Sequence, residues 1–220
     1  MMKTFGLVLA MVVLASASYA TVVTFDMYVG FETLACPVVP FNPEPSAVFN
    51  GLDFENGNPI LQRYDPFIGY KTYDYWSQPD AYFGGILLGD GYQVYNDGYA
   101  SGVNSVDGVP DGVPDALGNK TDMWISLPKA GWNLIGCPYN TAVTIDQDTG
   151  APIYFTDGTQ MLAWGAALGV FLNSDNMQRW SGPYWVFAGM NWSGEEQMLP
   201  GKGYWIYTTV DNLAMVILAP

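Results

Sequence analysis

The aromatic side chains are the residues of this chain that are best suited to contact a ligand. The 220 residues include 8 Trp, 15 Tyr and 11 Phe. Exposed Trp and Tyr rings stack on the faces of sugar rings, while nearby acidic or amide side chains hold the sugar hydroxyls. Tyr184, Trp185 and Trp192 are the best candidates for an exposed cluster and are the predicted ligand-binding residues. The alternative is that most of the rings pack in the core or in pairs across strands.

Three aspartates at intervals of four residues could bind a calcium ion. Asp107, Asp111 and Asp115 lie in the segment VDGVPDGVPDALG. Calcium takes roughly six to eight oxygen ligands, and turn-rich acidic loops can supply them. The segment lacks the D-x-D-x-D-G start and the bidentate Glu of the common calcium loops. The favoured interpretation is therefore an acidic linker stiffened by proline, and no other cofactor is expected.

Two arginines and two aspartates stand at corresponding places in the two halves of the chain. Arg63 lies in the segment LQRY and Arg179 in the similar segment MQRW. Asp26 and Asp122 likewise begin the similar segments DMYV and DMWI. A guanidinium group forms bidentate hydrogen bonds with a carboxylate. The repeated combination predicts structural pairs of Arg63 with Asp26 and of Arg179 with Asp122, in preference to arginines that bind an anion or a sugar.

The composition argues against most catalytic chemistry and against nucleic acid as a partner. The chain has no His, which excludes His-based triads and ordinary His-containing zinc sites. A glycosidase needs two carboxylates that flank the bond it cleaves, whereas Glu195 and Glu196 would point to opposite faces of a strand. The net charge of −14 disfavours binding to phosphates. We therefore expect a protein that is not an enzyme and whose partners are proteins or polysaccharide.

The first 20 residues have the composition of a secretory signal peptide. Lys3 is followed by the apolar run 5–14 and then by small residues that end in SYA at 18–20. This apolar run is too short to span a bilayer, which takes about 18 residues or more. The sequence predicts a signal peptide at 1–20 and export of the chain to the cell surface or the medium. No transmembrane segment is expected in the mature chain.

Exported proteins can keep disulfide bonds, and this chain has two cysteines, Cys36 and Cys137. A bond between them requires a short distance between their Cα atoms, which the sequence does not supply. The alternative is a pair of buried thiols that behave as small apolar side chains. Both alternatives remain open at this point.

The two halves of the chain contain five similar segments in the same order. The longest match aligns GFETLACP at 30–37 with GWNLIGCP at 131–138. Another aligns GDGYQVY at 89–95 with GKGYWIY at 201–207. Matches in the same order predict an internal duplication and therefore two units of similar fold.

The matched segments are typical of β-strands, because they are rich in Tyr, Trp, Val and Ile and are bounded by turn residues. We predict a mainly β fold with two related β-sandwich-like or barrel-like units, at 21–102 and 121–220. The segment 103–120, rich in Gly, Pro and Asp, is the predicted linker.

The second unit is expected to carry a short helical insertion. The interval from Cys137 to Gln178 is 41 residues, and the corresponding interval from Cys36 to Gln62 is 26, so 15 residues are extra. Apolar residues spaced along 159–172 favour a short helix there, capped by Thr159. In the strand YWIY at 204–207, we expect Tyr204 and Ile206 to face the core and Trp205 to pack beneath this helix.

The segments GWNLIGCP and PGKGYWIY, at 131–138 and 200–207, resemble the opening and closing strands of a β-rich module found in secreted bacterial surface proteins. The segments LQRYDP and DGYQVY of the first half resemble a diverged copy, although the two cysteines depart from the pattern. The resemblance implies a location and a fold, and it carries over no catalytic residue. We expect a secreted non-enzymatic surface or matrix protein with a structural or adhesive role, acting on copies of itself or on other envelope or extracellular proteins. The alternative is a carbohydrate-binding module that uses exposed Trp and Tyr.

Overall fold

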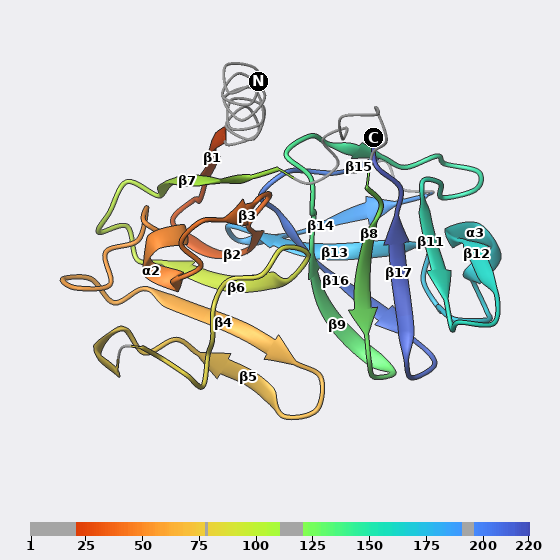
Figure 1. Ribbon diagram of the computed structural model, residues 1–220, viewed down its shortest axis with the longest axis horizontal. Coiled ribbons are helices and arrows are strands. Elements are labelled where there is room, and N and C mark those ends of the chain that lie inside the picture. Colours follow the sequence, from red (N-terminus) through yellow and green to blue (C-terminus); the bar gives the residue numbers. More distant parts are fainter. Residues whose placement is uncertain (1–20, 78, 111–120, 191–195) are drawn as a thin grey trace, which may run out of the picture.

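The computed structural model describes residues 21–77, 79–110, 121–190 and 196–220 (Figure 1). The predicted signal peptide at 1–20 lies outside the described residues. Strands account for 47% of the structure and helices for 6%, which confirms the mainly β prediction. In the described part of the chain, neither short helix has the length or the apolar character that crossing a membrane requires.

In the residues that the structure describes, the first half of the chain contains seven strands and the second half ten. The elements of the first half are β1 (Thr21–Asp26), β2 (Gly30–Ala35), β3 (Val39–Pro40), α2 (Pro45–Val48), β4 (Ile60–Asp65), β5 (Gly69–Thr72), the 3-10 helix η1 (Tyr75–Ser77), β6 (Gly91–Asn96) and β7 (Val103–Val109). Those of the second half are β8 (Met123–Leu127), β9 (Gly131–Gly136), β10 (Val143–Thr144), β11 (Ile153–Thr156), β12 (Met161–Ala163), α3 (Trp164–Ala167), β13 (Asn176–Ser181), β14 (Tyr184–Gly189), β15 (Gln197–Met198), β16 (Gly203–Thr208) and β17 (Leu213–Ile217).

An eight-stranded antiparallel sheet runs through both halves of the molecule. Its strand order is β5-β4-β6-β2-β13-β16-β9, and β14 pairs with β13 beside this path. A three-stranded sheet, β1-β7-β3, accompanies the first half, and a four-stranded sheet, β12-β11-β17-β8, accompanies the second. Figure 1 shows the first half at the left, in red to yellow, and the second half at the right, in green to blue.

Each half packs its own hydrophobic core between the large sheet and its smaller sheet. One cluster of buried residues draws on the chain between Phe25 and Val106, and the other on the chain between Ile125 and Ile217. Successive side chains of a strand point to opposite faces of a sheet. Tyr204 and Ile206 of β16 are 0% and 2% exposed and belong to the second core, as the sequence predicts.

The two halves meet at two places that use the matched segments in the same way. The amide of Ala35 donates a hydrogen bond of 3.0 Å to the carbonyl of Gly201. The amide of Gly136, which corresponds to Ala35, donates one of 2.8 Å to the carbonyl of Gly89, which corresponds to Gly201. In both contacts, therefore, the donor is the backbone amide at the matched position of one half, and the acceptor is the carbonyl of the matched glycine in the other half.

Two glycines allow this close approach of the halves. A Cβ atom at Gly91 would lie 2.5 Å from the carbonyl oxygen of Ile135. At the corresponding Gly203 it would lie 2.7 Å from the carbonyl oxygen of Leu34. Because any larger residue would collide with backbone atoms, glycine is required at both positions.

The predicted pair of Arg63 with Asp26 is wrong. Arg63 stands opposite Tyr92 in the pairing of β4 with β6, and its guanidinium forms an ion pair of 2.7 Å with Asp90. Asp26 ends β1 in a different sheet, where its carbonyl accepts a hydrogen bond from the ammonium group of Lys202.

The predicted pair of Arg179 with Asp122 is also wrong. Asp122 is exposed, and its carboxylate accepts a hydrogen bond of 3.0 Å from the amide of Ala219. Arg179 is only 6% exposed and lies in the large sheet. Burial lowers the pKa of Lys202, and the charge of Arg179 lowers it further. The position of Arg179 in the large sheet depends on the register in which β13 pairs with its neighbours. The spacing of residues along the sequence does not determine this register.

Two predictions about connecting segments also need correction. Residues 103–109 of the predicted linker form the strand β7, of which residues 103–108 pair with β1. Residues 111–120 lie outside the described residues. The predicted helix at 159–172 is reduced to the single turn α3, preceded by the strand β12. Thr159 does not cap it, because the Thr159 hydroxyl and amide both bind the carboxylate of Asp157.

The cysteines are buried free thiols and not a disulfide. The Cys36 thiol donates a hydrogen bond to the carbonyl of Val38 at 3.2 Å, and the Cys137 thiol makes the corresponding contact with Tyr139 at 3.7 Å. Burial raises the pKa of Cys36 to about 11 and that of Cys137 to about 12. Because the thiolate is the reactive form, both groups are inert in the folded protein.

We expect neither thiol to react with Ellman's reagent in the native protein at pH 8, and both to react in urea without a reductant. At a pKa of about 11, roughly one Cys36 side chain in a thousand is ionised at that pH. Unfolding removes the burial that raises the pKa, so both thiols then titrate. The prediction fails if reaction in urea requires prior reduction, since this would reveal a disulfide.

Candidate ligand-binding site

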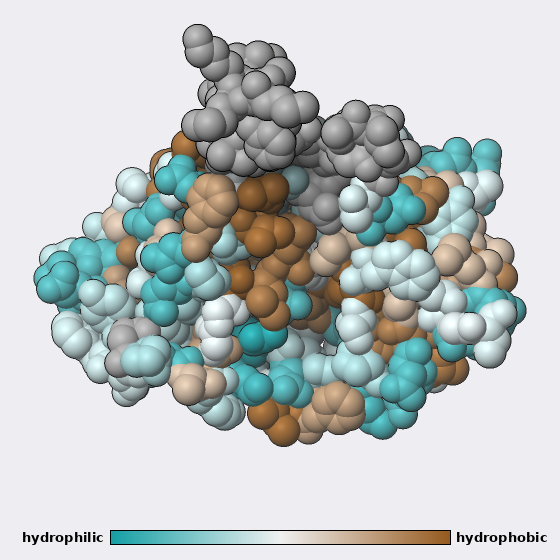
Figure 2. Space-filling view, viewed as in Figure 1, coloured by the Kyte–Doolittle hydropathy of each residue, from teal (hydrophilic) through white to brown (hydrophobic). Residues whose placement is uncertain are grey.

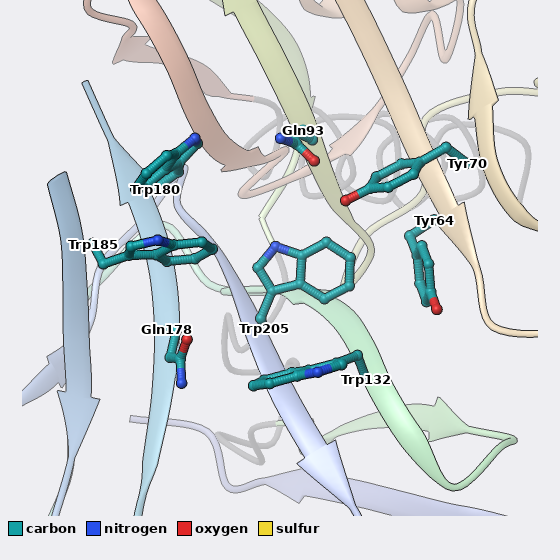
Figure 3. Close-up of a pocket in the computed structure, with 8 residues that line it drawn as sticks. All are labelled: Tyr64, Tyr70, Gln93, Trp132, Gln178, Trp180, Trp185 and Trp205. Carbon is teal, nitrogen blue, oxygen red and sulfur yellow. The ribbon is translucent and has the colours of Figure 1, made fainter. Parts of the chain in front are cut away.

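An aromatic groove of about 540 Å³ lies between the two halves of the molecule. Six rings and two amides face it (Figure 3). We call it the aromatic groove, and its lining residues are Tyr64, Tyr70, Gln93, Trp132, Gln178, Trp180, Trp185 and Trp205. Three come from strands β4, β5 and β6 of the first half, and five from β9, β13, β14 and β16 of the second.

The alternation of side chains along the strands places these residues in the groove. Because Tyr204 and Ile206 point into the core, Trp205 between them points to the opposite face of the large sheet. Gln93, at the corresponding place in β6, faces the same way. The groove therefore lies on the face of the sheet that the two cores leave uncovered.

Strand pairing brings the rings together on the two sides of the groove. Tyr64 stands opposite Tyr70 in the β4–β5 hairpin, and Trp180 stands opposite Trp185 in the β13–β14 hairpin. The rings of Trp180 and Trp185 lie 4.3 Å apart with 34° between their planes. Figure 3 shows the two hairpins facing each other, with Trp205 between them.

Trp205 joins the two halves at the floor of the groove. Its ring lies 4.9 Å from that of Tyr64 and 6.5 Å from that of Trp132, in both cases edge to face. Trp205 is only 8% exposed, whereas Trp132 and Trp185 are 42% and 47% exposed. The buried Trp205 ring thus supports Trp132, and Trp180 supports Trp185, which leaves a face of each of these two exposed rings open to the groove.

The prediction that Trp205 packs beneath the extra helix is wrong. The helix α3 belongs to the second core, where Trp164 is fully buried and contacts Phe155. Trp205 lies on the other face of the large sheet and contacts Tyr64 and Tyr70 of the first half. The pairing of β16 with β9 and β13 fixes this orientation, and the insertion does not reach that face.

The polar groups of the aromatic groove are available to a ligand. Among the described residues, none of the eight lining side chains makes a hydrogen bond to the protein. The amides of Gln93 and Gln178 can each donate and accept, and the indole N–H groups can donate. Burial raises the pKa of Tyr70, so its hydroxyl also stays protonated and can donate.

One of the three predicted ligand-binding residues lies in the groove. Trp185 lines it, whereas the neighbouring Tyr184 is 70% exposed and does not. Trp192 lies outside the described residues. The other seven lining residues were not predicted from the sequence. The available signal was the alternation of side chains along a strand, since Trp205 stands between two residues that were assigned to the core and Gln93 stands at the corresponding place in the first half.

The predicted calcium ligands are not assembled into a site by the described residues. Asp107 lies on the strand β7 opposite Val22, and its backbone carbonyl accepts a hydrogen bond from Phe41. Asp111 and Asp115 lie outside the described residues. In the part of the chain that the structure describes, no three acidic or Cys side chains come close enough to hold a metal ion.

Comparison of the chain with protein-family models, with curated protein sequences and with solved structures found no match.

Proposed function

We propose that this protein is exported and binds an uncharged polysaccharide in the aromatic groove, without cleaving it. The single observation that carries the proposal is the combination of six rings with two amides whose hydrogen-bonding groups are not used by the described protein. Sugar rings offer apolar C–H faces to aromatic side chains and hydroxyl groups to amides, so such a lining complements them.

The charge of the protein favours an uncharged ligand. None of the eight lining residues carries a charge at neutral pH. The whole chain has a net charge of −14, which repels polyanions such as acidic polysaccharides. We therefore expect binding that depends little on salt concentration, because no counterions need to be displaced.

The proposal combines the two functions that the sequence suggests. In this proposal the protein has a structural or adhesive role in an extracellular matrix because it binds polysaccharide, and not because it assembles with copies of itself. The signal-like residues 1–20, the two similar halves and the resemblance to modules of secreted bacterial surface proteins support a location outside the cytoplasm. The eight residues that line the aromatic groove include no carboxylate.

A panel of immobilised polysaccharides tests the proposal. Purified protein from residue 21 onward is applied to cellulose, xylan, mannan, starch and chitin, and to the anionic polymers alginate and pectate. We expect retention on at least one neutral polymer, equal at low and high salt, together with quenching of Trp fluorescence. Retention only on the anionic polymers, or on none of the panel, would contradict the proposal. Light scattering of the free protein should show a monomer, and growth into large species would restore the self-assembly role.

A further inference from the structure

The two halves of the large sheet adjoin at two places, β2 beside β13 and β4 beside β9, and we call each of these junctions a seam. The seam between β2 and β13 is closed by hydrogen bonds. At the closed seam, Ser181 of β13 pairs with Glu32 of β2. The amide of Trp180 donates a hydrogen bond of 2.9 Å to the hydroxyl of Thr33, and this hydroxyl also lies 3.5 Å from the carbonyl of Trp180. The Thr33 hydroxyl is thus the hydrogen-bonding partner of both the backbone N–H and the backbone C=O of Trp180.

The other seam, between β4 and β9, is open. No strand pairing joins β4 to β9 in the residues that the structure describes. In the matched segments, Tyr64 and Asp65 of β4 correspond to Trp180 and Ser181 of β13. Asn133 and Leu134 of β9 correspond to Glu32 and Thr33 of β2. These four residues of β4 and β9 all line a cleft of about 340 Å³, which we call the seam cleft. Figure 2 shows the surface hollowed between the two halves.

The hydroxyl that bridges the closed seam has no counterpart at the open one. Leu134 stands where Thr33 stands in the closed seam, and leucine has no hydroxyl to bridge to the opposite backbone. By the matched register, the backbone N–H and C=O of Tyr64 face the cleft in the way that those of Trp180 face Thr33. These groups are therefore directed into the seam cleft.

The polar side chains of the seam cleft suit hydroxyl groups better than an anion. Arg63 is paired with Asp90 at 2.7 Å, and Lys71 is paired with Asp65 at 3.2 Å. Each cation is thus neutralised by a carboxylate that can still accept a hydrogen bond from a hydroxyl. Ser126, which is exposed at the edge of the cleft, adds a further hydroxyl.

We infer that the seam cleft is a second part of the same binding site, which takes further sugar units of a polysaccharide chain held in the aromatic groove. Tyr64 lines both cavities and connects them. The inference rests on the proposed function, and it specifies that the ligand is a chain longer than the groove alone can hold. A short oligosaccharide occupies the groove, and a longer one gains contacts in the cleft.

Titration calorimetry with graded oligosaccharides of the retained polymer tests this inference, starting from the disaccharide. For the unaltered protein, affinity should rise about ten-fold or more from short to long chains. Leu134→Thr supplies the hydroxyl that closes the other seam, and Ser126→Met narrows the cleft from its exposed edge. Both variants should lose this gain for long chains and should bind short chains within about two-fold of the unaltered protein.

The two variants keep the test decisive. Leu134 is 9% exposed, so binding by Leu134→Thr is interpreted only if thermal melting shows that this variant is folded. If it is not folded, Ser126→Met, which changes an exposed residue, provides the test. If affinity does not increase with chain length, or if the variants keep the increase, the seam cleft is not part of the site and the aromatic groove stands alone. If no oligosaccharide binds at any length, the proposed function itself fails and this inference with it.

Discussion

Replacing Trp185 with Ala is expected to weaken polysaccharide binding about ten-fold or more, which corresponds to about 1.4 kcal/mol, and to leave the fold intact. The Trp185 ring is 47% exposed and lies against Trp180, so it offers one face to a ligand without supporting the core. Truncating an aromatic anchor in a binding site commonly costs about 2 kcal/mol. Titration calorimetry or quenching of Trp fluorescence measures the loss.

Trp132→Ala should have a similar effect from the other end of the groove, because Trp132 is 42% exposed. The two rings lie on separate strands, so the losses of the double variant should approximately add in free energy and give about a hundred-fold weakening. Trp76→Ala is the matched control, since Trp76 is 74% exposed in η1 and does not line the groove. Unchanged binding by Trp185→Ala and Trp132→Ala would show that polysaccharide binds elsewhere.

Replacing Glu32 with Gln is expected to destabilise the protein by about 3 kcal/mol. The Glu32 side chain is 1% exposed and lies 3.6 Å from the ammonium group of Lys202, across the junction of the two halves. It also accepts hydrogen bonds from the amide of Tyr28 and the hydroxyl of Ser181. Removing the carboxylate leaves Lys202, whose side chain is 16% exposed, beside the positive charge of Arg179. Breaking a buried pair on one side costs about 3–5 kcal/mol.

Urea denaturation measures this loss, and two further variants identify its cause. Lys129→Met removes an ion pair whose side chains are both 45% exposed, and it should change stability by about 0.5 kcal/mol or less. Adding Lys202→Met to Glu32→Gln removes the uncompensated charge and should recover part of the loss. If adding Lys202→Met increases the loss of stability, the Glu32 carboxylate acts through its hydrogen bonds with the Tyr28 amide and the Ser181 hydroxyl and not through Lys202.

The sequence predicts the elements of this fold better than it predicts the partners of individual side chains. Strand composition and alternation correctly assign the β class and the inward direction of Tyr204 and Ile206. The partner of Arg63 could not be obtained in the same way. Asp26 and Asp90 are both acidic residues of the first half, and only the pairing of β4 with β6 decides between them.

The aromatic groove is harder to predict for a similar reason. Its rings come from strands that are distant in sequence, and they become neighbours only when the halves are placed against each other. The contact of Tyr64 with Trp205 joins residues 141 positions apart, as the difference between their numbers shows. Trp205 is also flanked by the core residues Tyr204 and Ile206, so hydropathy gives no sign that this ring faces the groove.

A binding groove made from two halves of one chain does not depend on how dilute the protein becomes. Two separate chains forming the same groove would dissociate once their concentration fell below their dissociation constant, as happens after release into a large volume. Covalent connection replaces that concentration with an effective local one, on the order of millimolar for short connections. Each molecule of this protein therefore keeps its complete groove at any dilution.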